Sequence, residues 1–334
     1  MKKQFRIALI GCGAIAGNHV TAITETNNIL CALCDILPEK AEALMEKYGL
    51  HDIPVYTDYR EMIQKEAPDA VHICTPHDLH APMTVYALER EIHVLCEKPM
   101  CITPEQMEEV RRAAKKSRAY LGYCFQNRYE PNMIRLHEMA KENGVASAIG
   151  TVVWKRDAAY YASAAWRGTV EHEGGGVMIN QAIHTLDILQ WICGMPTHVL
   201  AHVSNDVLGD AIEVEDTASA RFETEDGTVF FIFATNTAKK GLPVELQVQL
   251  ADKTTVIAQN HHMVVNNELM ATGKAQLGTG KAEWGKGHTA LTADFYACIE
   301  EGRPFPIGVE EAEKAVRLIF AMYASNGKRV PIPQ

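Results

Sequence analysis

Long hydrophobic runs are absent from this 334-residue sequence. No stretch approaches the roughly 18 consecutive apolar residues that a membrane-spanning helix needs, so we expect no transmembrane segment. The apolar run near the start has only about five residues, too few for the hydrophobic region of a secretory signal peptide. Internal repeats and low-complexity domains are also lacking. We therefore predict a globular protein of the cytoplasm, long enough for two domains.

Positively charged residues are fewer than negatively charged ones. The chain has 32 lysines and arginines against 42 aspartates and glutamates, which gives a formal net charge of −10. This balance argues against nucleic acid or an anionic membrane as the main partner, although it leaves room for a local basic pocket. We expect neither as a partner.

Paired cysteines and metal-ligand spacings are lacking too. The nine cysteines are odd in number and scattered through apolar segments, which favours reduced thiols over a disulfide framework. Cys31 and Cys34 lie three positions apart in a predicted strand and so face opposite sides. His77, His80 and His93 form no i, i+4 pair and have no cysteine at ligand spacing. We predict no metal site.

A glycine-rich segment follows the first predicted strand, residues 5–10. It is the G-x-G-x-x-A form of the dinucleotide-binding motif, and a helical pattern follows it to about residue 26. Gly11 permits a tight turn, Gly13 lets a pyrophosphate approach the backbone, and Ala16 is small enough for helix-on-strand packing. The helix N-terminus offers N–H groups and a positive dipole to the phosphates. The residues predicted to bind the cofactor here are Gly11, Cys12, Gly13, Ala14, Ile15 and Ala16.

Asp35 ends the second predicted strand, residues 29–33, and lies 24 residues after Gly11. A carboxylate at about this spacing accepts hydrogen bonds from the ribose hydroxyls and repels a 2′-phosphate. We therefore favour NAD as the cofactor. NADP stays possible because Lys40 could reach a phosphate. The alternative for Asp35 is a helix cap before Pro38.

Strands and helices alternate as far as residue 124, which is typical of a doubly wound parallel sheet. We predict a Rossmann domain over residues 1–124. In such sheets ligands bind outside the carboxyl ends of the strands. The further residues that we expect beside the cofactor are Thr75, Pro76, His77, His80, Glu97, Lys98 and Asn127.

Glu97-Lys98-Pro99 follows a buried strand predicted over residues 92–96. A charged pair is unusual at the carboxyl end of such a strand. Pro99 restricts Lys98 to an extended conformation, which aims its side chain. The alternative is an ordinary strand end with a surface Lys-Glu pair.

The second part, residues 125–334, has long extended segments with hairpin signals such as Glu225-Asp226-Gly227. We predict an α+β domain with an open, mostly antiparallel sheet, and C-terminal helices that can pack back on the first domain. One face of such a sheet needs a cover, commonly a helix or another subunit.

One predicted helix, residues 177–193, follows three glycines at 174–176. Asn180 and His184 share a face of this helix, and Asp187 lies three positions further on. Each glycine costs about 1 kcal/mol against alanine in a helix, so the triplet suggests a close approach to the backbone. The alternative for His184 is a core histidine that Asp187 caps.

Aromatic residues flank an arginine in the loop before this helix. The residues are Tyr160, Trp166 and Arg167. Ring faces that stack and a guanidinium that donates hydrogen bonds suit a polyol or a sugar. Surface packing explains the same residues equally well.

Together, the glycine motif at 11–16, Thr75-Pro76 with His80, Glu97-Lys98-Pro99 and the glycine triplet before His184 resemble the Gfo/Idh/MocA family. Glucose–fructose oxidoreductase and inositol dehydrogenase are members. The resemblance covers nearly the whole chain. It implies a Rossmann domain followed by an α/β domain whose open sheet forms homodimers or homotetramers. It also implies hydride transfer between NAD(P) and a hydroxyl or carbonyl of a sugar, inositol or sugar derivative, or alternatively a sensor of the same fold without turnover.

The family's catalytic lysine and histidine match Lys98 and His184. An aspartate usually stands four residues before that histidine, and here it is Asn180, which can orient His184 or bind substrate but cannot act as a base. With ordinary pKa values of about 6.5 and 10.4, histidine fits the acid/base role and lysine the electrostatic role. The roles reverse if Lys98 is strongly desolvated. The resemblance thus implies catalysis by Lys98, His184 and Asn180, the last two also binding substrate.

Overall fold

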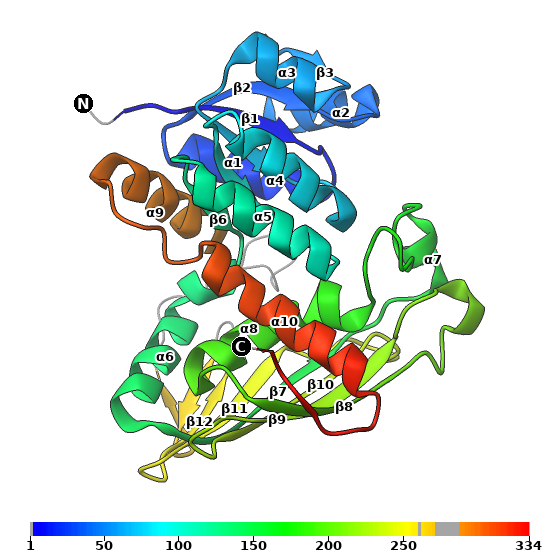
Figure 1. Ribbon diagram of the computed structural model, residues 1–334, viewed down its shortest axis with the longest axis vertical. Coiled ribbons are helices and arrows are strands. Elements are labelled where there is room, and N and C mark those ends of the chain that lie inside the picture. The colour runs from blue at the N-terminus through cyan, green and yellow to red at the C-terminus, as the bar shows by residue number, and fades with distance from the viewer. Residues whose placement is uncertain (1–2, 260–261, 271–286, 334) are drawn as a thin grey trace. The chain divides into compact units, whose positions relative to one another are not determined.

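The computed structural model describes residues 3–259, 262–270 and 287–333 (Figure 1). The chain folds into two compact units. The first comprises Met1–Gln126 with Lys286–Ala312, and the second comprises Asn127–Gly285 with Glu313–Gln334. Among the described residues, none of the helices combines the length and the apolarity that crossing a bilayer requires.

The first unit is built on a six-stranded sheet in which every neighbouring pair is parallel. This confirms the predicted doubly wound sheet, since the order 3-2-1-4-5-6 is that of a dinucleotide-binding fold. The strand interiors are buried because helices cover both faces. In spatial order the strands are β3 (Val55–Tyr56), β2 (Ile29–Cys34), β1 (Arg6–Ile10), β4 (Ala70–Ile73), β5 (His93–Cys96) and β6 (Leu121–Tyr123).

Local sequence signals set several helix ends in this unit. Thr103 caps α5 by accepting a hydrogen bond from the backbone N–H of Gln106 at 3.2 Å, as its N-cap position predicts. Gly49 ends α2 in the left-handed region, at φ +62°. The helices are α1 (Ala16–Glu25), α2 (Pro38–Tyr48), α3 (Tyr59–Glu66), η1 (His77–Leu79), α4 (His80–Leu88), α5 (Pro104–Lys116) and α9 (Gly287–Glu301).

Helix α9 comes from far along the chain and packs against α1. Thr289 Oγ1 donates a hydrogen bond to Glu25 at 2.8 Å, which links the two helices at their exposed edge. Their packing brings residues near both ends of the sequence into one core, a point on which the site depends.

The second unit contains a nine-stranded sheet that is mixed but mostly antiparallel. Among the strands that the structure describes, the one parallel pair is β7 with β10, and the connection between them includes a helix, as is usual between parallel neighbours. In spatial order the strands are β14 (Glu268–Met270), β13 (Met263–Val265), β12 (Thr255–Ala258), β11 (Glu245–Leu250), β7 (Val145–Val153), β10 (Val229–Thr235), β9 (Thr217–Glu223), β8 (His198–Ser204) and β15 (Val330–Pro331).

Helices cover one face of this sheet. Helix α8 packs on β7 and β10, and α6 packs on β11 and β12 (Figure 1). Burial alternates along the strands, as a half-covered sheet requires. The helices are η2 (Gln126–Tyr129), α6 (Pro131–Asn143), α7 (Ala158–Ala162), η3 (Met178–Ala182), α8 (Ile183–Cys193), η4 (Gly209–Ala211) and α10 (Val309–Ser325).

The helix expected over residues 177–193 is not a single α-helix. Its first part, η3, is a five-residue π-helix, and only Ile183–Cys193 is α-helical. The π-helix contains Asn180, and His184 lies in the first turn of α8. Such wide turns are rare and often occur at functional sites.

A buried ion pair holds the start of α8. Arg128 donates from Nε to one Asp187 oxygen at 2.8 Å and from Nη2 to the other at 2.6 Å. Both side chains are almost fully buried, and the guanidinium also lies over the Trp191 ring. This two-pronged geometry is the strong form of the interaction. Asp187 therefore pairs with Arg128, a partner that its place in the sequence did not indicate.

Replacing Asp187 tests how much this ion pair contributes to the stability of the fold. We expect Asp187→Ala to lower the free energy of unfolding by about 3–5 kcal/mol, because the Arg128 guanidinium would stay buried after losing its two hydrogen bonds to this carboxylate. The measurement is urea unfolding followed by circular dichroism. In the control, Glu61→Ala removes the exposed pair with Lys65 and should cost less than about 1 kcal/mol. Equal costs in the two variants would contradict this assignment.

Candidate functional site

The glycine loop after β1 has the geometry of a phosphate cradle. Gly11 has φ +91°, and a Cβ there would lie 2.6 Å from the carbonyl oxygen of Cys74, so only glycine fits. A Cβ on Gly13 would meet nothing within 4 Å in the described structure. The space over Gly13 is therefore open to a ligand, and the loop leads directly into the N-terminus of α1.

Asp35 lies at the end of β2, next to this loop. Its carboxylate accepts hydrogen bonds from the backbone N–H of Cys12 at 2.8 Å and of Leu37 at 3.0 Å. The first bond ties the end of β2 to the glycine loop, and the second bridges the approach to α2. A carboxylate can accept about four hydrogen bonds, so capacity is left for ribose hydroxyls. The residues of this loop therefore fit a bound dinucleotide.

His80 joins the segments that follow β4 and β5. Its Nδ1 lies 2.7 Å from the Pro99 carbonyl oxygen, and its Nε2 lies 3.0 Å from that of Thr75. Burial lowers the pKa of His80, and the contacts with the two carbonyl oxygens oppose this shift. The histidine thus ties the Thr75-Pro76 turn to the Lys98-Pro99 segment at the carboxyl edge of the sheet, and the centres of the His77 and His80 rings lie 5.7 Å apart at an interplanar angle of 50°.

Glu97 directly follows β5, with its side chain buried in the first unit. One carboxylate oxygen lies 3.1 Å from His19 and 3.1 Å from His288. Sequence reasoning missed both histidines, because each lies on a helix far from Glu97 in the sequence. A buried position for a polar side chain is visible only once the fold is known. Lys98 is the next residue. Because the first unit includes residues 1–126, the cofactor-binding residues predicted between Gly11 and Lys98 all belong to it.

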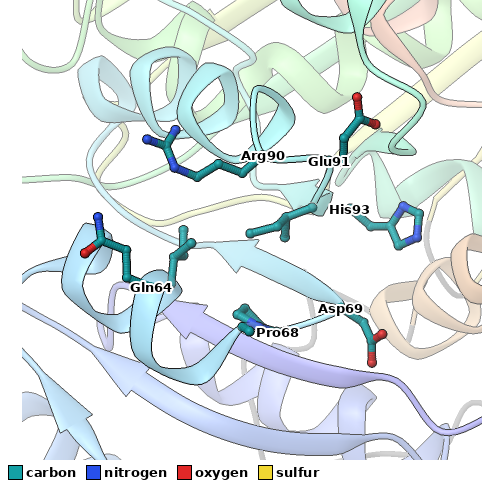
Figure 2. Close-up of a pocket in the computed structure, with 9 residues that line it drawn as sticks. Gln64, Pro68, Asp69, Arg90, Glu91 and His93 are labelled. Carbon is teal, nitrogen blue, oxygen red and sulfur yellow. The ribbon is translucent and has the colours of Figure 1, made fainter.

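A pocket of about 400 Å³ opens elsewhere in this unit (Figure 2). Asp69 and Pro68 precede β4, and Arg90 to Ile92 precede β5, so the pocket lies at the amino-terminal ends of these strands. The glycine loop lies at the opposite, carboxyl-terminal edge. The pocket is therefore separate from the predicted cofactor site.

The glycine triplet in the second unit is explained by close packing within the chain. A Cβ on Gly175 would overlap the Tyr323 hydroxyl, and one on Gly176 would overlap the Glu215 carbonyl oxygen. The Glu215 carboxylate accepts from the backbone N–H of Gly176 at 2.8 Å and of Met178 at 3.0 Å. The close approach that the triplet predicted is thus made by Glu215 and Tyr323 and fixes the start of the π-helix.

A second buried carboxylate lies beside Asn180. Asn180 Nδ2 donates to Glu173, and the backbone N–H of Gly168 donates to the other oxygen of the same carboxylate. Burial raises the pKa of Glu173, and these hydrogen bonds together with the charge of Arg167 oppose the shift. Since its Nδ2 faces Glu173, Asn180 turns its Oδ1 away from that carboxylate. Sequence reasoning missed Glu173 because it precedes the glycines and belongs to no motif.

The predicted aromatic and arginine residues also come together in this unit. The guanidinium of Arg167 lies 4.4 Å from the Tyr160 ring centre and 4.6 Å from that of Trp166, and it donates to the Tyr160 hydroxyl. Gln181 Nε2 donates to the same hydroxyl at 3.4 Å, which connects this cluster to the π-helix. His184 is partly exposed, and Asn127 lies in η2.

Two family models match the chain. The model described as "Oxidoreductase family, NAD-binding Rossmann fold" matches residues 5–125, and the GFO/IDH/MocA C-terminal domain matches residues 143–255. The chain belongs to the Gfo/Idh/MocA oxidoreductase family. Its first unit therefore carries an NAD-binding Rossmann domain, as the glycine loop and Asp35 predict.

Two curated dehydrogenases match a little over half of this chain. The chain is 35% identical to D-glucoside 3-dehydrogenase of Escherichia coli K12 over 57% of this chain and 54% of the relative. It is 25% identical to inositol 2-dehydrogenase of Salmonella paratyphi B over 56% of this chain and 54% of the relative. Each match thus spans about half the relative's length. The crystal structure of the WlbA dehydrogenase from Bordetella pertussis, in complex with NADH and UDP-GlcNAcA, is 25% identical, covers 99% of this chain and 100% of that chain, and has a TM-score of 0.85.

Gly13 offers a test of the cradle that leaves the fold intact. We expect Gly13→Ala to keep the wild-type melting temperature, since its Cβ meets no atom within 4 Å, and to weaken NAD binding at least tenfold, about 1.4 kcal/mol. Isothermal titration calorimetry measures the affinity. Gly308→Ala in the same unit is the control, because its Cβ makes only ordinary contacts, and it should bind NAD normally. An affinity for NAD within twofold of wild type in Gly13→Ala would remove Gly13 from the site.

Proposed function

We propose that the protein is an NAD-dependent dehydrogenase that transfers a hydride between nicotinamide and a hydroxyl or carbonyl group of a sugar, an inositol or a sugar derivative. The observation that carries this proposal is the position of Lys98, which follows β5 at the sheet edge that also carries the glycine loop. Ligands of doubly wound sheets bind at this edge. Relatives named for glucosides and inositols support the substrate class.

In this proposal, bound NAD supplies the hydride acceptor, and the chain's own residues handle the substrate oxygen. Lys98 donates a hydrogen bond to that oxygen and stabilises the negative charge that develops there. His184 takes the proton, because the ordinary pKa of histidine, about 6.5, suits a base near neutral pH. Lys98 belongs to the first unit and His184 to the second.

Asn180 replaces the aspartate that the family usually has four residues before its histidine. The hydrogen bond to Glu173 holds the amide in one orientation, so that its Oδ1 serves as an acceptor for substrate or for His184. The negative charge thus lies one side chain further away, on a carboxylate whose pKa burial raises. Tyr160, Trp166 and Arg167 complete the proposed substrate contacts, with residues 1–124 as the cofactor domain and 125–334 as the substrate domain.

An NAD-reduction assay followed at 340 nm tests this function. The compounds are methyl D-glucoside, myo-inositol and UDP-GlcNAcA, chosen from the three groups of relatives. We expect at least one to be oxidised, and we expect Lys98→Ala and His184→Ala to lose at least a hundredfold in kcat while NAD still binds. Lys65→Ala and His202→Ala, both at exposed positions, are the matched controls and should retain turnover.

Near-normal turnover in Lys98→Ala or His184→Ala would contradict the catalytic role proposed for that residue. NAD binding without oxidation of any of the three compounds, with UDP-GlcNAcA or a glucoside still bound, would favour the sensor, which has the same fold but no turnover.

We also propose that the protein forms a homo-oligomer through the outer face of the nine-stranded sheet. One row of residues crosses six neighbouring strands on this face, from β12 to β8. Four of its six members are apolar and between 36% and 41% exposed. Single exposed apolar residues are ordinary, whereas several on one face of a sheet mark an interaction surface. The row is Ile257, Gln247, Ile149, Phe231, Arg221 and Leu200.

A charge in this row should break the oligomer. We expect Ile149→Glu to run as a monomer in size-exclusion chromatography with light scattering, because its neighbours in the row, Gln247 and Phe231, offer no positive charge to a buried carboxylate. Ile134→Glu, at a similarly exposed apolar position on α6, is the control and should leave the mass unchanged. An unchanged mass in Ile149→Glu would contradict the proposed interface. All nine cysteines are free and buried, which suits the reducing cytoplasm that we propose as the protein's location.

A further inference from the structure

Glu97 is the centre of a buried hydrogen-bond network in the first unit. Its Oε1 lies 3.1 Å from His19 Nε2 and 3.1 Å from His288 Nε2, and its Oε2 accepts from the backbone N–H of Lys98 at 3.3 Å. Glu97, His19 and His288 are all at most 6% exposed. A carboxylate that is removed from water needs donors of this kind to stay ionised. The network therefore joins α1, the end of β5 and α9.

The network continues away from Glu97. His19 Nδ1 lies 2.9 Å from His72 Nδ1, and His72 Nε2 lies 2.9 Å from the Tyr296 hydroxyl. His72, on β4, is fully buried, and Tyr296, on α9, is 4% exposed. We call Tyr296, His72, His19, His288 and Glu97 the Glu97 network.

Chemistry fixes the proton positions along this chain of contacts. An ionised carboxylate only accepts hydrogen bonds, so His19 must donate from Nε2. Burial lowers the pKa of His19 and lowers that of His72 still further, so both rings are neutral and carry one proton each. His19 Nδ1 then accepts, His72 donates from Nδ1, and the Tyr296 hydroxyl donates to His72 Nε2. Every donor in the chain points toward Glu97.

The ionised state of Glu97 follows from the same contacts. Burial by itself raises the pKa of Glu97, but the hydrogen bonds from His19 and His288 and the electrostatic interactions with both rings together hold it well below its usual range. Loss of either histidine would remove one of the interactions that lower the pKa of Glu97. The residue that depends most directly on Glu97 is Lys98, because the carboxylate both precedes it and accepts its backbone N–H.

We propose that Glu97 is a positioning residue for Lys98, and that His288 together with the Tyr296–His72–His19 chain sets the place and the charge of its carboxylate. The inference rests on the proposed function, since only that reaction gives Lys98 a catalytic role. Glu97 acts through the Lys98 backbone and does not itself touch substrate. The network thus links the carboxyl edge of the sheet, where Lys98 lies, to α9. His288 on α9 follows Glu97 in the sequence by 191 residues.

A metal ion is the competing occupant of this place. Ligand atoms of His19, Glu97 and Cys124 lie within 4.8 Å of one another, and all three residues are buried. In a metal site His19 Nε2 would carry no proton, since a metal ligand uses its lone pair. The hydrogen-bonded network requires the opposite, with the proton on that nitrogen.

Histidine NMR on the wild-type protein saturated with NAD separates these arrangements without any substrate. Long-range ¹H–¹⁵N correlations report which ring nitrogen carries the proton, and the signals are assigned by their loss in His19→Gln and His72→Gln. We expect the Nε2–H form for His19 and the Nδ1–H form for His72. The reverse forms, or one equivalent of zinc found by elemental analysis with an unprotonated His19 Nε2, would overturn the network.

The link to Lys98 is tested with a matched pair of variants. His288→Gln keeps an amide nitrogen near the place of Nε2 and can still donate to Glu97, whereas His288→Leu cannot. We expect His288→Leu to lose at least tenfold in kcat on whichever of the three compounds wild type oxidises, with NAD affinity and KM within threefold. His288→Gln should recover most of that loss. Faster hydrogen exchange of the Lys98 amide in His288→Leu alone should accompany it, and this readout needs no substrate.

The outcomes separate this inference from the proposed function. Equal kcat in wild type, His288→Leu and His288→Gln, with Lys98→Ala inactive, would overturn positioning by Glu97 and leave the catalytic role of Lys98 intact. Full turnover in Lys98→Ala would instead remove the proposed function. Should His288→Leu fail to fold, Glu97→Gln replaces it, since it keeps the shape and removes the charge, and it should show the same loss of kcat with little change in KM.

Discussion

A buried carboxylate stays ionised only if hydrogen-bond donors surround it, and the edge of the first sheet depends on that requirement at Glu97. The donors come from α1 and α9, which lie at opposite ends of the sequence. Packing of these helices is therefore a condition for the geometry at the end of β5. The segment after that strand is fixed a second time by His80, which contacts the Thr75 and Pro99 carbonyl oxygens.

In the second unit, too, buried carboxylates are surrounded by hydrogen-bond donors. Glu173 and Glu215 are buried carboxylates. Glu173 accepts hydrogen bonds from the backbone N–H of Gly168 and from the Asn180 side chain, and Glu215 accepts from the backbone N–H groups of Gly176 and Met178 at the start of the π-helix. The glycine triplet allows the chain to pass close enough for these bonds, because any Cβ at Gly175 or Gly176 would collide. In both units, a side chain with a proposed role in catalysis is adjacent to a buried acid that reacts with nothing. Such acids hold backbone in place, and their charge acts over a short distance.

Much of the architecture could be predicted from the sequence, since the signals are local. Alternating apolar runs and helical patterns predicted the parallel sheet. The glycine loop was predictable because strain at Gly11 follows from one tight turn. The π-helix was not, since one extra residue in a turn leaves the apolar spacing almost unchanged. Asp187 found a partner, Arg128, that lies 59 residues away.

The sequence by itself determined the kinds of residue that lie at the carboxyl edge of the sheet, because β1, β2, β4 and β5 are each followed by a motif that can be read alone. Only the tertiary structure decided their partners. His288 reaches Glu97 across 191 positions, His19 meets His72 across 53, and Asn180 donates a hydrogen bond to Glu173. The physical reason is that a hydrogen bond requires its two atoms within about 3 Å, and no local pattern in a chain specifies which distant segment will come that close.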